Sequence, residues 1–165
     1  MKTSYLTVLL VVFLIGCSTH VVAQMTSQEQ ETAKKEITET VGTIFKNLQN
    51  MDAESLYQSY AESPDFVQIS TEGTMVDFQN AKNLHAKWFT TLSSLNVTLV
   101  KETFRFLPCN TVIYIWLGKF EMRTKQGLQL KVDKFGITFI FRKVDSQWKV
   151  IQQQGSSLPP VPVKE

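Results

Sequence analysis

The sequence is poor in the residues that form disulfides and metal sites. Only two of its 165 residues are cysteines and only two are histidines. Cys17 and His20 fall within the first 23 residues, which leaves Cys109 and His85 for the rest of the chain. A single cysteine excludes an internal disulfide there, and one histidine without clustered carboxylates cannot supply the three or four ligands of a zinc site. The sequence therefore predicts a domain held together by its core, and it indicates no metal and no cofactor.

Basic runs and phosphate-binding motifs are missing as well. The formal net charge is +2, and the Lys and Arg residues are scattered rather than gathered among aromatic residues. No nucleic-acid partner is therefore expected. Neither a Gly-rich phosphate loop nor a Ser-His-Asp order is present. Cys109 follows a proline in a turn between two β-rich segments and has no base nearby in the sequence, so we interpret it as a structural residue rather than a nucleophile.

The only long apolar run lies at the N-terminus, over residues 6–15, after the positive charge of Lys2. It is shorter than the roughly 20 apolar residues of a membrane span, and it predicts a signal peptide over residues 1–23. Two ends are open. Residues 14–17 resemble a bacterial lipobox, with the signal ending at residue 16 and Cys17 lipidated, whereas residues 21–23 fit ordinary cleavage after Ala23. Both predict an exported protein, in the periplasm or lipid-anchored to the bacterial envelope, that touches the membrane only through this signal or anchor.

Helical periodicity follows the signal. Residues 24–36 are expected to be a tether and helix lead, frayed over residues 24–32, where large apolar side chains are scarce. From Ile37 to Leu48 the apolar residues recur along one helical face. Asp52 is a suitable N-cap for a second helix over residues 53–61, and Asp77 for a third that ends at residues 93–94.

After the third helix the pattern is that of strands. Residues 95–106, 111–123, 128–142 and 147–153 are β-rich and are joined by short turns, which predicts an antiparallel meander. A further strand is expected over residues 65–70, between the second and third helices. Residues 158–165 read as a Pro-rich tail. The fold class is therefore α+β, with three N-terminal helices packed on a strongly curved, mainly antiparallel sheet.

The order of these elements resembles the nuclear transport factor 2-like superfamily, in its SnoaL-like branch. The residues that carry the resemblance are the helix break at 51–52, Tyr60-Ala61 followed by Asp65-Phe66, the Gly73 turn, and the closing hairpin of 139–143 with 147–151. The resemblance covers residues 37–157 and implies a cone-shaped domain. It does not fix the function, because this superfamily includes isomerases, dehydratases, transport factors and proteins without known activity.

The same resemblance, through ketosteroid isomerase, implies which side chains line the cone, because alternate strand residues face opposite sides of a sheet. The implied pocket residues are Gln68, Ser70, Trp88, Tyr114, Trp116, Phe120, Ile137, Phe139, Gln152 and Gln154. Such an aromatic and neutral lining is suited to a small apolar or aromatic ligand. Our first hypothesis is therefore a small-molecule-binding domain without a recognised catalytic constellation.

Two alternatives remain. Ketosteroid isomerase chemistry is excluded because Ser70, Ile44 and Ile137 stand at the positions of its base, tyrosine and acid. An isomerase or dehydratase could instead use His85 with Tyr114 or with Asp133. Strand alternation places the Asp133 side chain on the cavity side of the sheet, unless a bulge near Gly136 reverses the alternation.

The third hypothesis is a dimeric scaffold. Residues 112–117 are apolar at both strand parities, so the sheet face away from the helices is expected to be too apolar for water. This predicts a homodimer through that open face.

Overall fold

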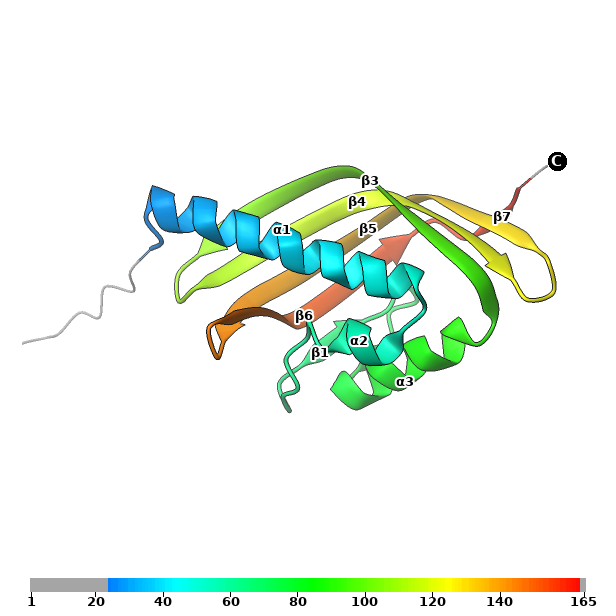
Figure 1. Ribbon diagram of the computed structural model, residues 1–165, viewed down its shortest axis with the longest axis horizontal. Helices are drawn as coiled ribbons and strands as arrows, with labels where there is room; N and C mark the ends of the chain where they lie inside the picture. Colours follow the sequence, from blue (N-terminus) through cyan, green and yellow to red (C-terminus); the bar gives the residue numbers. More distant parts are fainter. Residues whose placement is uncertain (1–23, 164–165) are drawn as a thin grey trace, which may run out of the picture.

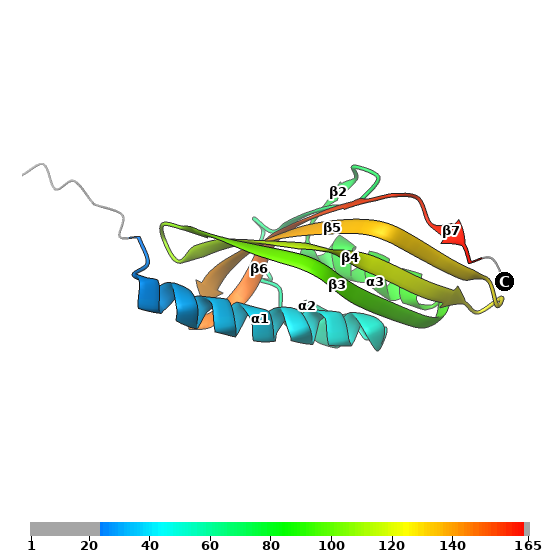
Figure 2. The same ribbon diagram turned by 90° about the horizontal axis from the view of Figure 1, so that it is seen from above.

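The computed structural model describes residues 24–163. The predicted signal peptide, its two cleavage sites and the lipidation candidate Cys17 lie outside these residues. Within them, three helices lie on one side of a curved seven-stranded sheet (Figures 1 and 2). The predicted α+β class, with N-terminal helices on a mainly antiparallel sheet, is confirmed. No helix of residues 24–163 has both the length and the apolar character that crossing a bilayer requires.

The first helix, α1 (Ser27–Gln49), begins earlier than expected. Thr26 accepts a hydrogen bond from the Glu29 amide, and the Glu29 carboxylate accepts one from the Thr26 amide at 2.7 Å, which completes a capping box. Met25 and Ala33 are buried. The expectation of a frayed lead over residues 24–32 was therefore wrong, because a capping box closes the start of the helix and Met25 and Ala33 pack into the core.

The next two helices are α2 (Ala53–Tyr57) and α3 (Phe78–Phe89). Their predicted N-caps are confirmed, since the side chains of Asp52 and Asp77 accept hydrogen bonds from backbone amides three residues further on. α2 ends four residues before its predicted end. The chain after it turns to the sheet, where Ser59 and Ala61 exchange backbone hydrogen bonds with Val150.

The sheet has the strand order β2-β1-β6-β5-β4-β3. Its strands are β1 (Val67–Ile69), β2 (Met75–Val76), β3 (Leu92–Leu107), β4 (Thr111–Thr124), β5 (Gln129–Val144), β6 (Gln147–Ser157) and β7 (Val161–Pro162). The four long strands form the predicted antiparallel meander, and β1 pairs with β6 in parallel. Two short strands were not predicted: β2 forms a hairpin with β1, and β7 pairs with β5, so the Pro-rich tail is partly ordered on the sheet.

Irregularities in the ladder change which side chains face the helices. The register shifts between Gly118 and Phe120 on β4, where Asp133 and Lys134 of β5 lie opposite the single residue Lys119, so that β5 has one extra residue. It also shifts opposite Ile140 and Phe141, where Ile151 of β6 is extra. Each extra residue reverses the alternation of the strand beyond it and increases the local bend. These two bulges shape the concave face that holds the site.

Candidate ligand cavity

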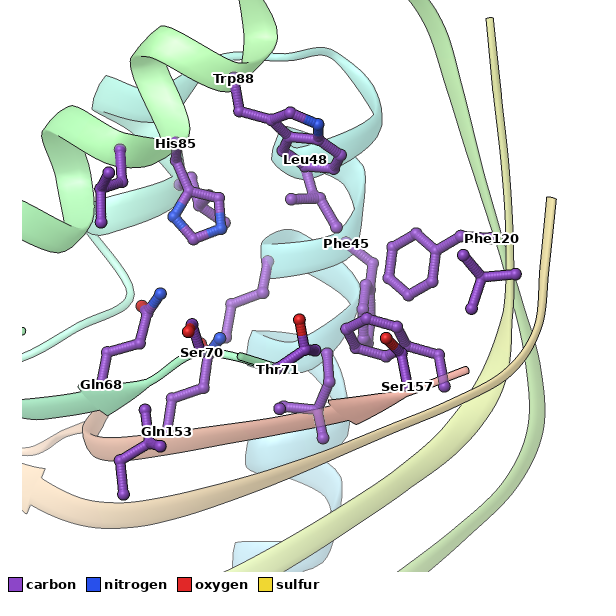
Figure 3. A pocket seen from close by; sticks show the side chains of 18 of the residues that line it. Phe45, Leu48, Gln68, Ser70, Thr71, His85, Trp88, Phe120, Gln153 and Ser157 are labelled. Carbon is purple, nitrogen blue, oxygen red and sulfur yellow. The ribbon is translucent and has the colours of Figure 1, made fainter. Parts of the chain in front are cut away.

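The concave face of the sheet and the three helices enclose a cavity of about 450 Å³ (Figure 3). Its walls come from α1, α2 and α3, from β1 and the turn after it, and from β4, β5 and β6. The lining consists of Ile44, Phe45, Leu48, Leu56, Tyr60, Gln68, Ile69, Ser70, Thr71, Glu72, Leu84, His85, Trp88, Phe120, Met122, Val132, Phe135, Ile137, Phe139, Gln153, Gly155, Ser157 and Pro160. Most of these side chains are apolar, so the cavity is suited to an apolar molecule.

Aromatic rings build one part of this lining. The ring centroids of Phe120 and Phe135 are 4.4 Å apart, and Phe45 lies 4.7 Å from Trp116, which packs behind it. Figure 3 shows Phe45, Leu48 and Phe120 on one side of the cavity, with Trp88 reaching over from α3. Rings at these separations contact one another directly, and they leave a fixed apolar wall.

The polar side chains gather around α3 and β1. The hydroxyl of Tyr57 donates a hydrogen bond to Oε1 of Gln68 at 3.0 Å and lies 2.9 Å from Nδ1 of His85. Gln153 pairs with Gln68 across the β1–β6 ladder, and its Oε1 accepts a hydrogen bond of 2.6 Å from Tyr60. In Figure 3 the imidazole of His85 projects from α3 into the cavity, above Gln68 and Ser70.

These inner polar groups are neutral. Burial lowers the pKa of His85 below its ordinary value, against the smaller opposing effect of a hydrogen bond to the Ala81 carbonyl. Burial also raises the pKa of Tyr57 and of Tyr60 far above the ordinary tyrosine value. The one carboxylate in the lining is that of exposed Glu72, which accepts a hydrogen bond from Thr71, and its pKa is lowered by that bond. The charge is therefore at the mouth and the interior is uncharged.

Six of the ten predicted pocket residues line the cavity: Gln68, Ser70, Trp88, Phe120, Ile137 and Phe139. His85, the weak catalytic candidate, also lines it. The three positions compared with ketosteroid isomerase, Ile44, Ser70 and Ile137, all face the cavity and carry no acid, base or phenol.

The prediction that Tyr114 and Trp116 line the pocket was wrong, because both are fully buried in the core and neither is part of the lining. Tyr114 donates a hydrogen bond of 2.6 Å to Glu102, and its pKa is raised by burial first and by that carboxylate second. The prediction from strand parity chose the right face of β4. It could not tell that Phe45 and the rings of β5 would cover this part of the face.

The prediction was also wrong for Gln152 and Gln154, which do not line the cavity. Trp148 and Val150 are buried on the side of the helices, but Ile151 is the extra residue of a bulge. Beyond it the alternation of β6 is reversed, so Gln153, Gly155 and Ser157 line the cavity.

Asp133 also lies outside the cavity. It is exposed, and its carboxylate pairs with Lys131 at 3.1 Å. The bulge that the sequence suggested near Gly136 occurs at Asp133 and Lys134. Because neither Asp133 nor Tyr114 reaches the cavity, the structure does not bring His85 together with its proposed catalytic partners.

Sequence reasoning missed Phe45, Gln153 and the tyrosine pair Tyr57 and Tyr60, whose rings stack with centroids 4.8 Å apart. The spacing of three residues between the tyrosines, at the end of a predicted helix, was an available signal that both point the same way. Across residues 24–163, no three His, Cys, Asp or Glu side chains are grouped as metal ligands would be.

No family model and no curated protein sequence matches the chain. Solved structures do. A candidate scytalone dehydratase from Novosphingobium aromaticivorans aligns with a TM-score of 0.75 and 11% identity, over 85% of this chain and 93% of that one. A hexachlorocyclohexane dehydrochlorinase aligns with a TM-score of 0.73 and 10% identity, over 84% of this chain and 94% of that one. A nuclear transport factor 2-like protein from Salmonella enterica aligns with a TM-score of 0.70 and 18% identity, over 79% of this chain and 94% of that one.

These similarities establish the fold and leave the activity open, since all three identities are low. The chain has the nuclear transport factor 2-like fold. Among the proteins that share it are enzymes that act on small molecules, which is compatible with a ligand site or an active site inside the cone.

Proposed function

We propose that this protein binds a small, uncharged and mostly apolar molecule inside the cone. The observation that supports the proposal is the cavity itself, which is of ligand size, is lined by aromatic and aliphatic side chains, and has only neutral polar groups in its interior. An apolar molecule gains free energy by leaving water for such a lining, and a few hydrogen-bonding groups orient it.

The enzyme alternative in which His85 acts together with Tyr114 or Asp133 is weaker, because neither partner lines the cavity. Tyr114 is engaged with Glu102 in the core, and Asp133 is paired with Lys131 on the surface. A reaction that uses His85 alone as the base is a second candidate, favoured by the neutral imidazole in the cavity. Loss of substrate over time, measured with each ligand that binds, distinguishes this candidate from binding without turnover.

Thermal unfolding with a panel of lipids, sterols, polyketides and aromatic compounds tests the proposal. A ligand at about 100 times its Kd adds roughly 2.7 kcal/mol to the free energy of unfolding, which raises Tm by several degrees. Two neighbouring serines provide matched variants, since Ser157 lines the cavity and Ser156 is exposed. Ser157→Trp should abolish the shift by filling the cavity, whereas Ser156→Trp should keep it. A panel that produces no shift contradicts the proposal.

We further propose that the protein is exported, either as a lipoprotein or as a periplasmic protein. The support is the apolar run of residues 6–15 and the two cleavage patterns that follow it. Mass spectrometry of the protein from its native cells should give an N-terminus at lipidated Cys17 or at Gln24. An N-terminus at Met1 would contradict export.

We also propose a homodimer through the sheet face opposite the helices. Figure 2 shows no helix on that side. Ile113, Ile115 and Leu117 of β4 face it, and Leu117 is 44% exposed. Removing such side chains from water favours association with a second apolar sheet.

A further inference from the structure

The hydroxyl of Tyr57 holds two side chains that face the cavity. Tyr57 is itself 2% exposed and does not line the cavity. Its oxygen lies 2.9 Å from Nδ1 of His85 and 3.0 Å from Oε1 of Gln68. One buried hydroxyl therefore fixes the orientation of both an imidazole from α3 and an amide from β1.

The contact with the Ala81 carbonyl indicates which nitrogen of the His85 ring carries the proton. That carbonyl lies 3.2 Å from the same Nδ1 of His85, and a carbonyl can only accept a hydrogen bond. Both oxygen contacts of Nδ1 are satisfied when Nδ1 carries the proton of the neutral ring, because its N–H is then shared between the Ala81 carbonyl and the Tyr57 hydroxyl. Tyr57 accepts from Nδ1 and donates its own proton to Gln68. This arrangement leaves Nε2 of His85 without a proton and the NH₂ group of Gln68 as a donor.

Both of these remaining groups face open space in the cavity. Among residues 24–163, neither Nε2 of His85 nor the NH₂ of Gln68 has a hydrogen-bond partner. No side-chain nitrogen or oxygen of the described residues is sealed off without a partner, so these two nitrogens keep exposed surface, and both residues line the cavity. Figure 3 shows the two side chains pointing toward one another from α3 and β1. The cavity thus presents an acceptor and a donor side by side.

Resting on the proposed function, we infer that the ligand is an apolar alcohol or phenol whose hydroxyl binds between His85 and Gln68. The hydroxyl donates its proton to Nε2 of His85 and accepts a hydrogen bond from the NH₂ of Gln68. One hydroxyl satisfies both groups, because it is both a donor and an acceptor.

Other polar groups match this pair less well. A ketone or an ether accepts from Gln68 but leaves the imidazole nitrogen unpaired, which costs free energy in a cavity from which the ligand has displaced water. A carboxylate would carry a charge into an apolar lining and place its lone pairs against that of Nε2. A hydroxyl on an aromatic or alicyclic body is the simplest group that fits.

Calorimetric titration of the full chain with three probes of similar shape tests the inference. The probes are naphthol, its methyl ether and methylnaphthalene. Naphthol should bind about tenfold more tightly than methylnaphthalene, the factor expected for one well-made hydrogen bond beyond what water offers. The methyl ether should also bind more weakly than naphthol because it cannot donate to His85.

Two variants assign this preference to the pair. His85→Leu should remove the preference for naphthol while the Kd of methylnaphthalene stays within about twofold, since the apolar contacts remain. Lys87→Leu, an exposed position on the same helix, is the matched control and should keep the preference. Tyr57→Phe keeps the ring and loses the bridging hydroxyl, so it should reduce the preference even if the histidine variant fails to fold.

The outcomes separate the two proposals. Equal binding of all three probes overturns the hydroxyl inference and leaves the apolar ligand site standing. Binding of none overturns the proposed function and the inference together. The ¹⁵N chemical shifts of the His85 ring give an independent result: a protonated Nδ1 with a bare Nε2 is expected, and the opposite tautomer overturns the inference without any ligand.

Discussion

His85 sets a pH dependence that can be measured on the protein without a ligand. Burial holds its pKa below the value of 6.5 that applies to the unfolded chain. Above 6.5 neither state binds the proton. As the pH falls below 6.5, the unfolded chain takes up a proton that the folded chain refuses, so the free energy of unfolding decreases until the folded pKa is reached. The stability from this residue is thus present above pH 6.5 and is lost on acidification.

Urea unfolding of the natural chain and of His85→Leu, at several pH values on either side of 6.5, measures this contribution. The natural chain should lose more stability than the variant over that window. Carboxylates whose pKa is lowered, such as Glu29 and Asp52, titrate further toward acid and are common to both proteins. Parallel pH profiles would contradict a neutral buried imidazole.

Gly118 is a position where any side chain would collide with its surroundings. A Cβ there would overlap the Thr98 carbonyl oxygen and the Trp116 indole. Gly118→Ala should therefore lower the stability by about 2 kcal/mol, because both neighbours are held in the sheet and core. Gly42→Ala is the control: it is exposed on α1 with open space around it, and it should raise the stability by roughly 0.5–1 kcal/mol. Equal effects of the two substitutions in urea unfolding would contradict this account.

Individual residues show where strand alternation predicts the cavity lining correctly and where it fails. It placed Gln68, Phe120, Ile137 and Phe139 correctly, because no extra residue separates them from the parts of the strands used to set the parity. It failed at Gln154, beyond the bulge at Ile151. A bulge depends on how two strands meet in space, and the local sequence carries little sign of it. The same limit hid the connection from Tyr57 to His85, which joins residues of two helices and a strand.

At the scale of elements, the start of α1 supplies a direct test. Thr26→Ala removes the side chain that accepts from the Glu29 amide and should cost about 1 kcal/mol. Amide hydrogen exchange should become faster in the first turns of α1 and stay unchanged in α3. Fast exchange over residues 27–33 in the natural chain would instead support the frayed lead that composition suggested.

Most element boundaries could be predicted because their signals are local. Asp52 and Asp77 are good caps, and the turns of the meander are short and polar. The short strands β2 and β7 could not be predicted, since each is held by a partner strand rather than by its own pattern. β7 follows Pro160, which lines the cavity, so the tail contributes to the cavity wall.

At the scale of the whole molecule, the two faces of the sheet differ in how they are covered. The concave face is covered by helices and keeps a cavity, whereas Ile113, Ile115 and Ile140 on the other face are only partly covered by their neighbours. A curved sheet that is apolar on both sides needs a second layer on each, and the helices of one chain supply only one. The proposed association through the open face and the proposed ligand binding in the cone therefore use different sides of the sheet.

Substitution at the centre of the open face tests the dimer. Ile115→Lys places a charge where two copies of β4 would meet, and desolvating that charge opposes association. Analytical ultracentrifugation at micromolar concentration should find the natural chain dimeric and the variant monomeric, with the same circular dichroism and the same ligand affinity. Thr43→Lys adds an equal charge to the exposed side of α1 and should leave the dimer intact. A monomeric natural chain, or a dimer that tolerates lysine at position 115, would exclude this interface and require another explanation for the apolar outer residues of β4.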